Sequence, residues 1–288
     1  MQSRLGAACA AAVLAAITAA GAVGCSSGGS GAATAPRASA NQLLSSSLRN
    51  LQGIGSYTAA LTVKASGIPG TGGGGITMSG TYSSQEKPSP LREFNATKVQ
   101  VAQLPIGAMD EVTTPAALYA KMPVLTALTH ASKPWVRIPE QGLQQGSATG
   151  LDQLLGEVQS VDPLSVARLL AGARNVRTVG TSTVSGAPVT EISGSEPGSA
   201  ALSSIPASLR SSLGQTVRKL GIKQITFQAW IDGQRNVRKL AVIVTGSAAR
   251  ETFNSTVTSV NKPVNISVPA AGQAETIPAS ALRGDLGL

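Results

Sequence analysis

The stretch KQITFQAWIDGQRNVRKLAVIVTG, residues 223–246, decides the fold of this chain. In its first half apolar and polar residues alternate, which is the pattern of a strand with one buried face. The apolar residues of that face are Ile225, Phe227, Ala229 and Ile231. Asp232 and Gly233 then signal a turn, and a second apolar strand runs back. Because an antiparallel sheet with an apolar face must cover it, the stretch predicts a sheet packed against other elements on one side.

The same alternation recurs on both sides of this hairpin. It predicts further strands at 56–66, 75–84, 91–102, 116–123, 134–139, 251–260 and 264–269, and two strands within 175–194 around a Ser-Gly turn. The glycine-rich run at 66–75 is interpreted as a hairpin connection. The first half of the chain is therefore expected to be a meander of antiparallel strands.

Three segments have helical patterns instead. Residues 41–52 place Leu43, Leu44, Leu48 and Leu51 on one helical face. Asp162 followed by Pro163 predicts the start of a second helix, and 207–220 predicts a third. The predicted class is α+β, a broad curved antiparallel sheet with helices on one side of it. Such helices can cover the apolar face completely, or they can leave an apolar cavity between themselves and the sheet.

The N-terminus has the pattern of an export signal. Residues 5–23 carry no charge, and Arg4 is the only positive charge before them. A transmembrane helix is the alternative interpretation of this run. We interpret 1–24 as a signal peptide and 25–39, which is rich in Ser, Gly and Ala, as a flexible tether. Because no second linker follows, 40–288 is expected to be a single domain.

The sequence AVGC at 22–25 resembles the lipobox of bacterial lipoproteins. The resemblance implies that Cys25 is diacylated and becomes the new N-terminus, so that the protein is anchored at the extracytoplasmic face of the cell membrane. The alternative is a cysteine that merely lies near a cleavage site. Cys9 lies inside the predicted signal, so the mature chain would have no thiol for a disulfide, for a metal site or for catalysis.

The chain is basic, with a formal net charge of +9. Part of this charge is clustered around one acid, Asp232, and consists of Arg210, Arg218, Lys219, Lys223, Arg235, Arg238 and Lys239. This cluster either faces an anionic membrane surface or is an ordinary solvated face. We expect no nucleic acid partner for an exported, anchored chain.

Catalytic signals are weak. His130 is the only histidine in the chain, and it lies in a segment that we interpret as a solvated loop between two strands. The adjacent acids Asp110 and Glu111 would point to opposite faces of a strand, and we interpret both as surface residues. We therefore predict no catalytic residue, no metal site and no cofactor, and an enzyme, such as a hydrolase using His130, is the least favoured class.

Several short features, in order, resemble the LppX/LprAFG-type lipoproteins of actinobacteria, whose fold is like LolA. They are LYAKMP at 118–123, KPWVRIP at 133–139, the helix and paired strands at 161–192, AWIDGQRNVRKLAV at 229–242 and VNKPVNISVPAAGQ at 260–273. The resemblance implies a half-barrel sheet whose concave face packs against helices around a hydrophobic cavity. It further implies an acylated lipid or glycolipid as ligand and an envelope lipid transporter as a possible partner.

The candidate cavity residues are apolar side chains on the alternating faces of the predicted strands. They are Leu61, Val63, Met78, Phe94, Val101, Leu118, Ile225, Phe227, Leu240, Val242 and Phe253. Residues of this kind are more often ordinary packed core. The sequence does not say which face lines a cavity, because a register error of one residue moves a whole set to the other face. The sequence thus favours a lipid carrier, and the alternative is an envelope scaffold or interaction lipoprotein without a ligand.

Overall fold

The computed structural model of this chain describes residues 38–67, 75–87, 89–101, 104–139, 162–200, 221–247 and 249–278. All of these residues belong to one compact unit, Ala38–Leu288. The predicted signal peptide, Cys25, most of the tether and the predicted helix at 207–220 lie outside the described residues. Those predictions therefore stay predictions.

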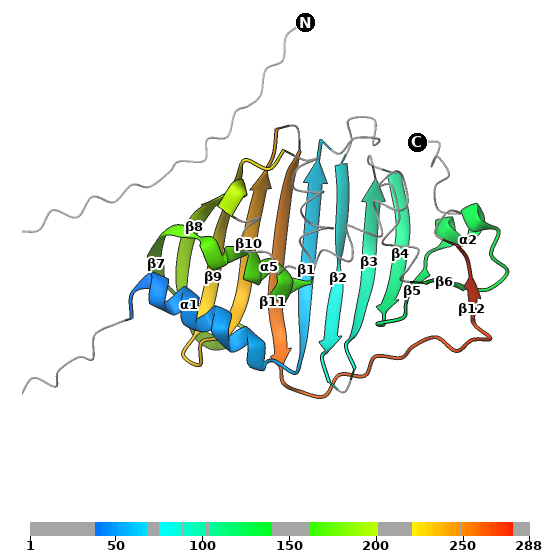
Figure 1. Ribbon diagram of the computed structural model, residues 1–288, viewed down its shortest axis with the longest axis horizontal. Coiled ribbons are helices and arrows are strands. Elements are labelled where there is room, and N and C mark those ends of the chain that lie inside the picture. The colour runs from blue at the N-terminus through cyan, green and yellow to red at the C-terminus, as the bar shows by residue number, and fades with distance from the viewer. Residues whose placement is uncertain are drawn as a thin grey trace, which may run out of the picture. The chain divides into compact units, whose positions relative to one another are not determined.

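In the described part of the chain, twelve strands form one curved, unclosed sheet (Figure 1). Its order is β12-β6-β5-β4-β3-β2-β1-β11-β10-β9-β8-β7. Neighbouring strands are antiparallel except β12 and β6, which are parallel. The strands are β1 (Ser56–Ser66), β2 (Gly75–Gln85), β3 (Leu91–Val101), β4 (Leu104–Thr113), β5 (Ala117–Lys121), β6 (Trp135–Pro139), β7 (Arg174–Val184), β8 (Ala187–Pro197), β9 (Gln224–Asp232), β10 (Val237–Thr245), β11 (Arg250–Val260) and β12 (Ala274–Thr276).

The sheet consists of two meanders joined side by side. Strands β1 to β6 follow one another in space as in sequence, and so do β7 to β11. The two meanders meet where β1 pairs with β11, in a register that runs from Tyr57 opposite Val260 to Ser66 opposite Arg250. We call this pairing the central seam. It brings the first and the last long strands together in the middle of the sheet (Figure 1).

The described helices and 3-10 turns are short. They are α1 (Ala40–Asn50), η1 (Leu51–Gly53), α2 (Pro123–Thr129), α5 (Pro163–Arg168) and η2 (Leu169–Gly172). Helix α1 begins with a reciprocal capping box, in which Ser39 and Gln42 bond each other's backbone N–H groups. Asp162 caps α5 and Pro163 is its first residue, as predicted. Figure 1 shows α1 and α5 across the same side of the sheet.

The strand register places the apolar residues on that side. Val63 on β1 lies opposite Met78 on β2 and opposite Phe253 on β11. Residues directly opposite one another share a face, so this row continues through Val242 on β10 to Phe227 on β9. The same apolar cluster includes Leu43 and Leu44 of α1. The predicted α+β class, with a curved antiparallel sheet and helices on one face, is therefore confirmed.

Three local predictions were incomplete or wrong. Strand β4 was missed, because Pro105 and Gly107 interrupt its alternation. The segment before His130 was interpreted as loop and contains helix α2. The predicted strand at 264–269 does not form, since Pro263 and Pro269 each lack an N–H group for pairing and the segment is largely exposed. After β11 the chain instead runs past the ends of the first meander's strands, and β12 then pairs with β6 (Figure 1).

Candidate functional site

The apolar residues predicted to line a cavity lie together on one face of the sheet. Each is between 0% and 4% exposed, and all belong to one hydrophobic cluster. They are Leu61, Val63, Met78, Phe94, Val101, Leu118, Ile225, Phe227, Leu240, Val242 and Phe253. We call this surface the apolar face. The register thus brings all of them together, whereas their role as lining of a lipid cavity stays a prediction.

Polar groups gather at one end of the apolar face, where β1 and β3 begin and β2 and β4 end. The hydroxyl of Tyr57 on β1 donates a hydrogen bond to Asp162 Oδ1, and the same carboxylate caps α5 by accepting from Leu164 N at 3.0 Å. The Tyr57 ring stacks on Tyr82 of β2, with centroids 5.7 Å apart. Burial, and then the Asp162 charge, raise the pKa of both phenols well above their ordinary value.

Glu111 on β4 belongs to this polar end, which corrects its predicted surface position. It lies opposite Phe94 and is 4% exposed. Its Oε1 accepts a hydrogen bond from Thr113 Oγ1 at 3.2 Å, and its Oε2 has no partner in the described part of the chain. Burial raises the pKa of Glu111 to about 8, so the carboxyl is largely protonated at neutral pH.

Asp110 has the surface position that was predicted for both acids. It points to the other face of β4 and forms a half-exposed ion pair with Lys121, with Nζ and Oδ2 3.5 Å apart. Alternation along a strand was the correct principle. The mistake was to place both acids in solvent. Because adjacent residues point to opposite faces and one face of the sheet is buried, one of the two acids must be buried.

Arg92 on β3 completes the polar end. It lies opposite Thr113 and two residues from Phe94 along the strand. One guanidinium nitrogen, Nη2, lies 3.4 Å from Glu86 Oε1, and Ser84 Oγ donates to the same oxygen at 3.0 Å. The Arg92 Nε is buried and has no hydrogen-bond partner among the described residues. Arg92 was not predicted from the sequence, because nothing in a strand pattern marks an inward-facing cation.

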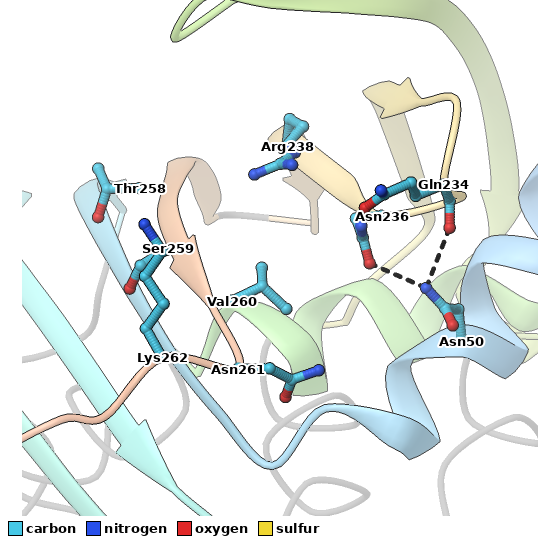
Figure 2. A pocket seen from close by; sticks show the side chains of 9 residues that line it. All are labelled: Asn50, Gln234, Asn236, Arg238, Thr258, Ser259, Val260, Asn261 and Lys262. Atoms are coloured by element: carbon cyan, nitrogen blue, oxygen red, sulfur yellow. Dashed lines mark hydrogen bonds between the residues drawn. The ribbon is translucent and has the colours of Figure 1, made fainter.

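A polar pocket of about 500 Å³ lies beside this end of the apolar face. It opens where β10 and β11 are no longer paired, beyond the pairing of Lys239 with Thr256. Asn50 at the end of α1 donates through Nδ2 to Asn236 Oδ1 at 2.9 Å and to the Gln234 carbonyl at 3.3 Å (Figure 2). The remaining lining residues are Arg238, Thr258, Ser259, Val260, Asn261 and Lys262. None of the predicted cavity residues lines it.

Asp232 holds two residues that line this pocket, Asn236 and Arg238. Its carboxylate accepts hydrogen bonds from Asn236 N at 2.9 Å and from Arg238 Nε at 2.6 Å. Burial alone would raise the pKa of Asp232, but the bonds from Asn236 and Arg238 outweigh it and lower the pKa. The Asp232-Gly233 pair was predicted as a turn, and it also fixes the Arg238 side chain.

The described members of the basic cluster do not form a free cationic surface. Arg238 is paired with Asp232, and Lys239 Nζ lies 4.4 Å from the centroid of the Trp230 ring. Lys223 is exposed and Arg235 is half-exposed. Arg210, Arg218 and Lys219 lie outside the described residues. The two interpretations of the cluster, a membrane-facing surface and a solvated face, both stay predictions.

No catalytic group emerges from the described residues. His130 is exposed, as predicted, and ends α2 in the left-handed conformation with φ of 51°. No cluster of three or more His, Cys, Asp or Glu side chains suited to a metal ion occurs in the described ranges. Within the same ranges, no helix has the length and apolar character needed to cross a membrane.

The structure is similar to solved lipoproteins. LprF from Mycobacterium bovis is 17% identical with a TM-score of 0.49, and the match covers 81% of this chain and 97% of LprF. Lipoprotein LppX from Mycobacterium tuberculosis is 15% identical with a TM-score of 0.46, covering 79% and 98%. A LolA superfamily protein from Nitrosomonas europaea is 10% identical with a TM-score of 0.30, covering 76% and 92%.

The resemblance to LppX/LprAFG-type lipoproteins found in the sequence is thus also found in the structure. No family model and no curated protein matches the sequence. At identities below 20%, a structural resemblance is not evidence of a shared ligand. The functional conclusion below therefore depends on the residues of this chain.

Proposed function

We propose that this protein is a membrane-anchored carrier that binds an acylated lipid or glycolipid on the apolar face of its sheet and moves it within the cell envelope. The observation that carries this proposal is the arrangement of that face. Apolar side chains continue from strand to strand across both meanders, and the inward-facing groups Tyr57, Tyr82, Arg92 and Glu111 gather near one end.

Such a face suits an amphipathic ligand. Acyl chains that leave water for an apolar surface gain about 0.8 kcal/mol for each buried CH₂ group, and no covalent step is needed. Polar parts of the ligand would lie at the polar end, where donors and acceptors already exist. Because the face is buried, a ligand would reach it by separating the elements packed over it.

The anchor follows from the N-terminal sequence. Cys25 is the proposed acylation site, and a tether of about 14 residues reaches roughly 20 Å. Two acyl chains hold a protein stably on a membrane. The folded unit would then remain close to the bilayer from which it takes lipid. An envelope transporter would be its partner in transfer.

An envelope scaffold without a ligand is the competing function. A scaffold is expected to present a large exposed apolar patch and to enclose no cavity. In the described part of the chain only Val179 and Val268 are large exposed hydrophobic residues, and they lie on β7 and in the segment after β11. The first of these two features therefore favours the carrier, and lipid binding tests the second.

The test is to express the full-length Cys25→Ser chain in a lipid-producing bacterium, purify it without detergent and weigh it by native mass spectrometry. A bound species with the mass of an acylated lipid is expected. A mass equal to that of the bare chain, unchanged after incubation with envelope lipids, would contradict the carrier and favour the scaffold.

A matched pair of variants locates the ligand. Val63 is 1% exposed on the apolar face, whereas its neighbour Lys64 is exposed on the other face. Val63→Trp is expected to lower the lipid-bound fraction severalfold because the indole occupies ligand space, and Lys64→Trp is expected to leave it unchanged. If the apolar face is tightly packed and binds no ligand, Val63→Trp is expected to lower the melting temperature by overpacking. In that case neither the Cys25→Ser chain nor its Val63→Trp variant carries lipid.

A further inference from the structure

Three buried polar atoms at the polar end of the apolar face have no hydrogen-bond partner among the described residues. They are Tyr82 Oη on β2, Arg92 Nε on β3 and Glu111 Oε2 on β4. The Tyr82 hydroxyl lies near that of Tyr57, which donates its own hydrogen to Asp162, and it forms no well-aligned hydrogen bond there. Buried polar groups nearly always have partners, so an unpartnered group in a folded protein calls for an explanation. Three of them on adjacent strands suggest that a group absent from the chain itself satisfies them.

The register places these three residues around Phe94 on adjacent strands. Phe94 lies opposite Tyr82 on one side and opposite Glu111 on the other. Neighbouring strands are about 4.8 Å apart, so the Cα atoms of Tyr82 and Glu111 are separated by about 10 Å. Arg92 precedes Phe94 by two residues, about 7 Å along the same strand. One small group lying over Phe94 could reach all three side chains.

The charges of the three groups favour a neutral ligand group. Glu111 is protonated at neutral pH, because burial raises its pKa to about 8, and it then offers an O–H donor together with acceptor oxygens. Tyr82 is likewise neutral, because its pKa is raised. The positive charge of Arg92 is offset by Glu86 at 3.4 Å, which leaves its Nε–H as a donor.

We propose that Tyr82, Arg92 and Glu111 form a polar subsite in the apolar face. It hydrogen-bonds the ester carbonyl and hydroxyl groups at the junction between the acyl chains and the head group of a neutral acylated lipid. This inference rests on the proposed function and adds the class of ligand and its orientation. From Arg92 the apolar face continues along β3 to Val101, about 30 Å away, which gives the acyl chains their direction.

The subsite is tested by competition between two lipids of equal chain length. The full-length Cys25→Ser chain is incubated with vesicles containing equal amounts of dipalmitoylglycerol, a diester, and dihexadecylglycerol, its diether analogue without carbonyls. The protein is recovered, and both bound lipids are quantified by mass spectrometry. We expect the diester to be enriched at least fivefold, because it alone offers carbonyl oxygens, which accept hydrogen bonds better than ether oxygens do.

Variants test whether Tyr82 and Glu111 are responsible for the preference for the diester. Tyr82→Phe removes a hydroxyl donor, and Glu111→Leu removes one together with the acceptor of the Thr113 hydroxyl. In each variant the enrichment is expected to fall toward one, and a thermal melt checks that the fold is kept. Glu111→Gln keeps a donor at this position and is expected to retain most of the enrichment. Asp110→Asn, which changes the adjacent acid on the other face, is the control and keeps the wild-type ratio.

The outcomes separate the two proposals. If the protein binds both lipids equally, or if the variants leave the ratio unchanged, the subsite is overturned and the carrier stands. If no lipid of either kind is recovered, the proposed function fails and the subsite fails with it.

Discussion

Gly194 on β8 lies directly opposite Phe227 on β9, and the Phe227 ring occupies the space that a side chain at position 194 would fill. A Cβ atom at position 194 would lie 2.7 Å from Cζ of that ring, closer than real Cβ contacts. The absence of a side chain at 194 is therefore what leaves room for the Phe227 ring.

Gly194→Ala is accordingly expected to lower the free energy of unfolding by about 1–3 kcal/mol, because overpacking forces the ring or the strand to move. The measurement is urea unfolding followed by circular dichroism. Gly180→Ala on β7 is the control, since its added Cβ meets nothing within 4 Å. Equal stability of the two variants would show that the ring can yield without cost.

Glu111 predicts a pH dependence of stability. The carboxyl has its ordinary pKa of about 4.5 in the unfolded chain and about 8 in the folded one. Between these values the folded state holds a proton that the unfolded state has lost. Stability therefore falls as pH rises through this window, by at most about 1.4 kcal/mol per pH unit for this group.

Glu111→Gln removes this titration. Its unfolding free energy, measured in urea from pH 4 to pH 9, is expected to fall less steeply with pH than that of the wild-type chain. The difference between the two proteins should grow above pH 4.5 and level off near pH 8. Parallel curves would show that the carboxyl titrates alike in both states, as it would if it were solvated.

The bond between Tyr57 and Asp162 links the sheet to helix α5. Tyr57→Phe removes a buried hydrogen bond to a carboxylate and is expected to lower the free energy of unfolding by roughly 2 kcal/mol. Denaturant titration measures the loss. Tyr119→Phe, at a half-exposed position on β5, is the matched control and should change stability by no more than about 0.5 kcal/mol.

Acylation of Cys25 predicts the cellular location of the protein. In an actinobacterial host, the wild-type chain is expected in the membrane fraction, and Cys25→Ser is expected to be soluble, because two acyl chains provide stable anchoring. Fractionation with mass spectrometry of the N-terminal peptide makes the measurement. A soluble wild-type chain would rule out the lipobox, and a membrane-bound Cys25→Ser chain would favour the transmembrane helix instead.

Much of the fold could be predicted because burial on one face leaves a period of two in the strands. Alternation at Tyr57, Leu61 and Val63 located β1, and the Ser185-Gly186 and Asp232-Gly233 pairs located two turns. The alternation failed in β4, where Pro105 and Gly107 interrupt it. The same alternation wrongly predicted a strand at 264–269, a segment that pairs with no neighbouring strand.

The candidate site could be predicted only in its apolar part. Buried apolar residues such as Val63 and Phe227 are visible in a strand pattern, whereas the polar end depends on which strands are neighbours. Glu111 and Arg92 come together only because β3 pairs with β4 in one particular register. Asp162 reaches Tyr57 from a position 105 residues away. No local pattern contains such information.

The central seam has a consequence for how the chain acquires its structure. Strand β1 is made early, but its partner β11 is among the last segments to be synthesised, about 190 residues later. Until then β1 presents an open edge, which is a template for pairing with other chains. Pairings of such long sequence separation form slowly. A product that stops before Arg250 would lack the second meander's link to the first, and we expect it to aggregate.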